Sequence, residues 1–235
     1  MRTSLRLNIA AVLAALMFLV SPSVSGAQTH EEKRVTDSAA VLETLVRAPD
    51  QGIPEHILER AEAIVVIPSL VKGGFIIGAQ HGRGIMSVRD RETNRWSAPG
   101  FIALTGGSIG WQIGVQAVDL VLLVMNRDGV KDLLDNEFKF GANASVAAGP
   151  VGRQGEASTD ASLNAQILAY SRAKGLFAGL SLEGASLRVD RDANKDFYGT
   201  TISTEDMVRG ITKTTPAGSQ WTATLTRLVP ASSTR

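Results

Sequence analysis

Glycines recur inside apolar segments of this 235-residue chain, and they constrain its fold more than any other feature. Ten of the 23 glycines fall within residues 73–114 and seven within 141–184, among short runs of valine, isoleucine and phenylalanine that are typical of strands. A glycine in such a run marks a bulge or the close approach of another backbone. The sequence therefore predicts a strongly curved sheet or a partial barrel.

Helices are expected before the strands. Val35, Ala39, Leu42 and Val46 follow one another at spacings of four, three and four, which predicts a helix over 30–47 with one face on the core. Pro54 is suited to the first position of a second, short helix that ends near residue 61.

Two further short helices are expected among and after the strands. One spans 126–136, with Asn126 as its cap, and the other begins at Ser203, with Asp206 as the capping partner. Turn signals such as His81-Gly82 are expected to separate the strands. The predicted fold class is α+β: a glycine-rich, mainly antiparallel sheet with N-terminal helices and one or two short helices packed on it.

A signal peptide is predicted at the N-terminus, and a strand followed by mobile residues at the C-terminus. Arg2 and Arg6 precede an apolar stretch, 9–20, that is shorter than the about 20 residues of a spanning helix, and small residues follow at 25–27, which predicts a secretory signal peptide over 1–27. An uncleaved anchor is the alternative. The main domain is expected over 28–211, and 212–235 should be a C-terminal segment with a strand, in which Trp221, Ala223 and Leu225 alternate, and then six mobile residues.

Composition excludes several classes of protein. The chain has no cysteine, so it can form neither a disulfide nor the acylated cysteine of a lipoprotein. Without 1–27 it carries 22 basic and 23 acidic residues, because Arg2 and Arg6 are the only charges lost from 24 and 23. The signs are interleaved, which argues against nucleic-acid binding.

Catalytic motifs are present only in fragments. Ser108 lies in a G-x-S-x-G pattern, but every histidine precedes it and no helical pattern follows, unlike a serine hydrolase of that type. Ser69 and Lys72 imitate a serine–lysine pair, but Pro68 and the glycines at 73–74 disfavour the helix that such a pair needs. Asp119 stands in an apolar run and is interpreted as a structural hydrogen-bonding group. The sequence therefore predicts no enzyme.

A short acidic segment has oxygen-bearing side chains at alternate positions, as a calcium loop has. The residues are Asp190, Asp192, Asn194 and Asp196. Lys195 and Thr201 occupy the positions where such a loop needs glycine and glutamate, so a polar turn is the preferred interpretation and calcium binding the alternative. No cofactor and no zinc site is predicted.

Several segments together resemble the SYLF domain family over roughly residues 35–200. They are the run from Tyr170 to Gly184, Val66-Ile-Pro68, Lys72-Gly-Gly-Phe75, Trp96-Ser-Ala-Pro99, Ala148-Gly-Pro150 and Thr159-Asp160. The resemblance implies lipid binding, because members of this family are described as lipid-binding domains. Eukaryotic members associate with phosphoinositide membranes, and some regulate or bundle actin.

The functional prediction combines this resemblance with the expected export. It is a non-enzymatic protein of the cell envelope, periplasmic or secreted, that engages anionic phospholipid head groups through a basic and aromatic surface. The export signal and the lack of an SH3 or FYVE module argue against actin as a partner, and a place in a bacterial envelope would argue against phosphoinositides as well. A structural or adhesive protein that binds other proteins is the alternative, and a hydrolase of lipid or cell wall is disfavoured; the oligomeric state is not predicted. The candidate lipid-binding residues are Lys72, Arg83, Arg172 and Lys174 for the head groups and Phe75, Trp96, Phe101 and Phe177 for the acyl boundary.

Overall fold

The computed structural model describes residues 28–229 except 50–51, 91, 135–137, 142–144, 152–164, 175 and 178–181, and only the backbone of 74–77, 108–114 and 177. The predicted signal peptide and the predicted mobile residues at the C-terminus both lie outside the described residues.

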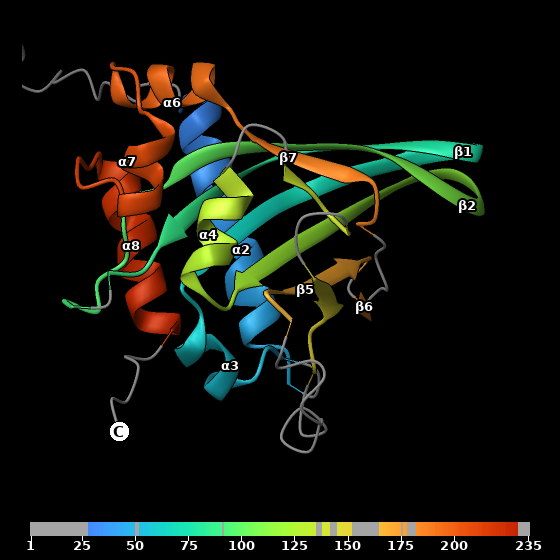
Figure 1. The fold of residues 1–235 in the computed structure, drawn as a ribbon, viewed down its shortest axis with the longest axis horizontal. Coiled ribbons are helices and arrows are strands. Elements are labelled where there is room, and N and C mark those ends of the chain that lie inside the picture. Colours follow the sequence, from blue (N-terminus) through green and yellow to red (C-terminus); the bar gives the residue numbers. More distant parts are fainter. Residues whose placement is uncertain are drawn as a thin grey trace, which may run out of the picture.

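Two long antiparallel strands, β1 (Ala63–Val88) and β2 (Gly100–Val124), form the centre of the fold. Their pairing runs from Ala63 opposite Val124 to Met86 opposite Gly100. Figure 1 shows both strands running out to a common end, away from α6, α7 and α8, and then returning. The register shifts between residues 74 and 76, a bulge of the kind that bends a strand pair. We call this outer end, residues 73–80 and 106–115, the ribbon tip.

The two halves of β1 pack against each other. The backbone N–H of Arg89 donates a 2.8 Å hydrogen bond to the carbonyl oxygen of Glu62, which joins the residues that flank the two ends of the strand. A Cβ placed on Gly82 would lie 2.6 Å from Cγ2 of Ile67, so only a glycine fits there. The prediction of a turn at His81-Gly82 is therefore wrong, because this glycine permits close approach inside a continuous strand.

Shorter strands extend the sheet along the edge of β2 that β1 does not occupy. β5 (Ile167–Ala173) pairs with residues 119–124 of β2, and β7 (Ala185–Val189) pairs with residues 102–106. Beyond them lie β3 (Phe138–Lys139) on β7, and β4 (Val146–Ala148) and β6 (Leu176–Phe177) on β5. Among the described strand pairs only β4 with β5 is parallel. The predicted fold class, a curved and mainly antiparallel α+β sheet, is confirmed.

Helices cover the sheet on both faces at the end opposite the ribbon tip. α2 (His30–Val46), α3 (Glu55–Arg60) and α8 (Pro216–Leu228) pack with Ile64 and Val66 of β1. α4 (Arg127–Leu134) and α7 (Thr204–Arg209) pack with Val65 and Ile67 on the other face, and α6 (Arg191–Tyr198) contributes to both. Because neighbouring residues of β1 face opposite clusters, this part of the sheet is buried on both sides. No helix in the described part of the chain combines the length and apolarity needed to cross a membrane.

The local helix signals are largely confirmed. α2 begins with a capping box between Thr29 and Glu32, and Pro54 is the N-cap of α3, one position earlier than predicted. Asn126 accepts a 2.7 Å hydrogen bond from the N–H of Gly129 at the start of α4, and Ser203 forms the predicted capping box of α7.

The predicted C-terminal strand is wrong, because residues 216–228 form α8. Trp221, Leu225 and Leu228 are buried at spacings of four and three, on one face of a helix, and Thr215 caps it. Arg227 forms an ion pair with Glu43 of α2, 3.1 Å between Nη1 and Oε1. The C-terminal segment is therefore packed on the N-terminal helix.

Candidate functional site

Apolar side chains are exposed on one face of the ribbon, at and beside its tip. Val115 is 80% exposed and Val71 is 46% exposed. The register places Val115 opposite Gly73, and Val71 opposite the exposed Ala117. Residues opposite each other, and residues two apart, share a face of an antiparallel pair, so these side chains lie together on it.

Two of the predicted basic residues flank the base of the tip. Lys72 is half-buried on β1, opposite Gln116. Lys174 is exposed in the turn that follows β5, with a φ of 49°. Since β2 separates β1 from β5, and neighbouring strands lie about 4.8 Å apart, the two backbones are on the order of 10 Å apart. The structure therefore brings these two predicted residues to the same end of the molecule.

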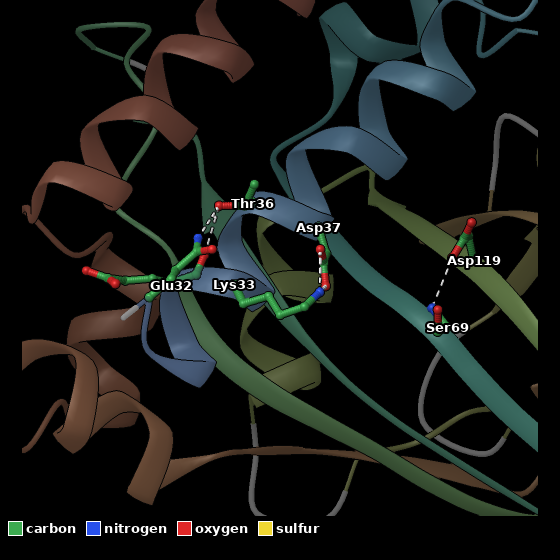
Figure 2. Close-up of polar contacts among 7 residues, drawn as sticks. Glu32, Lys33, Thr36, Asp37, Ser69 and Asp119 are labelled. Carbon is green, nitrogen blue, oxygen red and sulfur yellow. Dashed lines mark hydrogen bonds and ion pairs between the residues drawn. The ribbon is translucent and has the colours of Figure 1, made fainter. Parts of the chain in front are cut away.

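Arg172 has a carboxylate as its neighbour. It lies opposite Asp119 in the pairing of β5 with β2, and it is only half-exposed. Asp119 accepts a 2.9 Å hydrogen bond from the backbone N–H of Ser69, where β1 has a register shift (Figure 2). The interpretation of Asp119 as a structural group is confirmed. Arg172 is correspondingly less available to a lipid phosphate than Lys72 or Lys174, because its charge is partly balanced.

Arg83 does not lie at the ribbon tip. It lines a pocket between β1 and the start of α2. The pocket has a volume of about 570 Å³. Of its other cations, Lys33 forms an ion pair with Asp37 at 2.7 Å (Figure 2), and Arg34 forms one with Asp190 at 3.2 Å. The predicted basic residues are therefore divided between two surfaces.

Trp96 and Phe101 belong to the core and not to the surface on which they were predicted. Trp96 is 8% exposed, with the guanidinium of Arg89 4.7 Å from its ring centre. Phe101 is fully buried, 4.9 Å from the ring of Phe197, with the guanidinium of Arg34 at 5.2 Å. Both rings lie near the connection between β1 and β2, where later helices cover them. The side chains of Phe75 and Phe177 lie outside the described residues, although the backbone of Phe75 is in the ribbon tip.

The predicted polar turn at 190–196 is also wrong, because these residues cap and begin α6. Asp190 is the N-cap and accepts a hydrogen bond from the N–H of Ala193. Asn194 is buried and bonds both backbone groups of Phe101, at 2.9 and 3.0 Å. Asp192 and Asp196 are exposed on the helix. Residues two apart on a helix do not face each other, so the alternate oxygens do not converge as a calcium loop requires.

The catalytic motifs lack the backbone setting that each requires. Ser108 lies within β2 opposite Gly78, not at a turn from strand to helix. Ser69 has a φ of 51° inside β1, so it does not share a helical turn with Lys72.

Comparison with known proteins identifies relatives. A family model described as "Ysc84: Las17-binding protein actin regulator" matches residues 105–228. Protein YSC84 of Saccharomyces cerevisiae is 35% identical over 188 residues, 77% of this chain and 40% of the relative. LAS seventeen-binding protein 3 of the same species is 37% identical over 171 residues, 72% of this chain and 37% of the relative. The human SH3 domain-containing YSC84-like protein 1 is 34% identical over 166 residues, 70% of this chain and 48% of the relative. The chain thus spans less than half the length of each.

Proposed function

Because this chain belongs to the Ysc84 family, the family of the SYLF domain, we propose that it is a non-enzymatic protein that binds anionic phospholipid through the end of the molecule that carries the ribbon tip. The observation that carries the proposal is the exposed apolar face at Val71 and Val115, together with Lys72, on the other face of the strand pair, and Lys174, both at the same end of the molecule. Exposed apolar side chains with cations at the same end of a protein are the combination that an anionic membrane surface attracts.

The expected strength follows from these four side chains. Each lysine near an anionic surface contributes about 1 kcal/mol. Burying a whole valine side chain contributes about 1.5–3 kcal/mol, and the exposed parts of these two contribute correspondingly less. The polar and apolar contributions are therefore similar in size, so added salt should weaken binding without abolishing it.

The target and the location are part of the proposal. The basic N-terminal segment with its short apolar stretch supports export, and thus a periplasmic or secreted protein at a membrane surface. In that location the ligand would be the anionic phospholipid of an envelope membrane.

A protein partner is the second candidate. The description of the family model names Las17 binding and actin regulation, and the match covers less than half of each of the two yeast relatives. One observation favours this candidate: β5 and β7 pair with β2 only at residues 119–124 and 102–106, and no other described strand pairs with its outer edge between these stretches. An uncovered strand edge can accept a strand from a partner.

Vesicle sedimentation tests the lipid proposal. The protein is mixed with phosphatidylglycerol or phosphatidylcholine vesicles over a range of salt concentrations. We expect binding to phosphatidylglycerol that falls as salt rises. Lys72→Glu and Lys174→Glu should each weaken it by about 30-fold, because each removes one attraction and adds one repulsion.

Lys195→Glu is the matched control, because this exposed lysine is on α6, away from the ribbon tip (Figure 1), and its replacement changes the net charge equally. It should bind almost as the unmodified protein does. Equal losses in all three variants would contradict a local surface. Failure to sediment with either lipid would refute the lipid proposal and favour the protein partner.

A further inference from the structure

We propose that the ribbon tip enters the boundary between head groups and acyl chains end-on, while Lys72 and Lys174 stay at the level of the lipid phosphates. This inference rests on the proposed function and adds the element that inserts and its depth. The ligand is a phospholipid bilayer with an anionic surface.

The composition of the tip is the first argument. Neither of its two segments, 73–80 and 106–115, contains a charged residue. Aspartate, glutamate, lysine and arginine make up 20% of the whole chain, so their absence from both segments, of 8 and 10 residues, is a local departure. The large apolar residues of the tip are Phe75, Ile76, Ile77, Ile109, Trp111, Ile113 and Val115. Tryptophan and apolar residues of this kind are enriched where proteins meet the membrane interface.

The second argument is the position along β1 and β2 at which the buried core ends. On the outgoing half of β1 the buried core reaches Leu70, opposite Val118 of β2. On the returning half it ends at Gln80, which is 2% exposed and lies opposite Gly106 at the inner limit of the tip. The next positions outward, Val71 and Ala117, are exposed, and Val115 is more exposed still. The ribbon therefore continues beyond the core that packs its base, with its helices at the other end (Figure 1).

The third argument is the pair of lysines where the ribbon tip joins the rest of the sheet. Lys72 directly precedes the tip on β1, and Lys174 stands at the turn after β5. Both can place an ammonium group among phosphates while the segment beyond them meets the acyl chains. Asp119, the nearest carboxylate along β2, already accepts a hydrogen bond from Ser69.

Backbone hydrogen bonding limits the depth of insertion. In the part of the chain that the structure describes, no strand pairs with the outer edge of β2 over residues 107–118. Backbone groups without partners do not enter the hydrocarbon region. An interfacial position about 5–10 Å below the head groups keeps these groups near water. The strand length from Gly73 to the bend, about three or four residues at about 3.3 Å each, matches that depth.

Tryptophan fluorescence tests the insertion. Trp96 and Trp221 are 8% and 0% exposed, so Trp111 is the tryptophan expected to respond to lipid. The full chain and Trp111→Phe are titrated with phosphatidylglycerol vesicles that carry bromine either near the carbonyl end or near the methyl end of the acyl chains. We expect quenching of the unmodified protein, stronger with bromine near the carbonyl end, and almost none in Trp111→Phe.

Two charge-introducing variants locate the contact. Val115→Asp and Val71→Asp should each lower vesicle binding by about 30-fold or more, because a carboxylate would replace buried apolar surface at the interface. Ala223→Asp adds the same charge at an exposed position of α8, at the opposite end of the molecule, and should have little effect (Figure 1). The fluorescence of Trp96 and Trp221 reports whether each variant is folded.

The outcomes separate this inference from the proposed function. Salt-sensitive vesicle binding without quenching of Trp111 would overturn the insertion and leave peripheral lipid binding in place. Stronger quenching from the methyl end would overturn the interfacial depth. If no vesicle binds at all, the proposed function itself fails. If both valine variants fold and bind as Ala223→Asp does, the apolar face is not the contact.

Discussion

Replacing Gly84 with alanine tests whether β1 folds back on itself. An alanine Cβ at this position would lie 2.1 Å from the carbonyl oxygen of Val66 and 3.0 Å from Cα of Ile67. Both are backbone atoms of the first half of β1, which cannot rotate away as a side chain can. The two halves of the strand would have to separate by about 1 Å, a disturbance larger than an added methyl group normally causes in a core.

The expected cost is large in comparison with the stability of a domain. Overpacking of a core costs about 1–3 kcal/mol and occasionally more. Because the clash is with backbone, we expect a loss of about 3–5 kcal/mol from an unfolding free energy of about 5–15 kcal/mol. Gly107→Ala is the matched control in the neighbouring strand: its Cβ would have no atom nearer than the carbonyl oxygen of Gly78 at 3.9 Å. It should change stability by about 0–1 kcal/mol, in the stabilising direction.

Urea denaturation measures both variants. The fluorescence of the buried Trp96 and Trp221 follows unfolding, and linear extrapolation gives the free energy in water. If Gly84→Ala is within about 0.5 kcal/mol of the unmodified protein, or equal to Gly107→Ala, the two halves of β1 do not pack as described.

Three further predictions concern buried polar groups. Gln80 is 2% exposed and neither amide atom has a hydrogen-bond partner among the described residues, so Gln80→Leu should raise the unfolding free energy by about 1–2 kcal/mol; a loss in urea denaturation would contradict this. Asn194→Ala leaves both buried backbone groups of Phe101 without their partner, and it should cost about 2–4 kcal/mol in the same assay; a cost below about 1 kcal/mol would show that the contact matters little. Burial raises the pKa of Tyr170 and Tyr198 above the ordinary value of 10.0, so the unfolded chain loses these protons first. Stability should therefore fall above pH 10 by about 1.4 kcal/mol per pH unit for each tyrosine, and Tyr198→Phe should roughly halve that slope; an unchanged slope would exclude this cause.

Local signals in the sequence predicted local structure well. The caps at Asn126 and Ser203 were found because a capping side chain bonds an N–H only a few residues away. The curvature of the sheet was predicted because so many glycines stand in strand-like runs. What the glycines could not show is which role each plays. Gly82 looks like a turn residue in its own neighbourhood, and only the contact with Ile67 reveals close packing.

The C-terminal helix was missed for a similar reason. Trp221, Ala223 and Leu225 fit an alternating strand, but Trp221 and Leu225 are equally four apart on a helix. The cap at Thr215 and the proline after it were the signals that favour the helix. They were present in the sequence and were outweighed by the threonine-rich composition.

The candidate site was only partly predictable. Lys72 and Lys174 were found as cations beside apolar glycine-rich runs. Trp96 and Phe101 were wrongly predicted to be exposed, because the segments that cover this part of the sheet come much later in the sequence. The hydrogen bonds from Asn194 to the backbone of Phe101, almost a hundred positions apart, illustrate this. Val71 and Val115 were missed because their exposure depends on where the core and the neighbouring strands end. For Val115, the lack of charged residues over 106–118 was the available signal.

Hydrogen exchange of the full chain, with and without phosphatidylglycerol vesicles, tests the central claim most directly. The account predicts slower exchange on vesicles in peptides that cover 71–80 and 106–117, and unchanged exchange in α8. Slower exchange in α8, or unchanged exchange at the ribbon tip while the protein remains vesicle-bound, would contradict it.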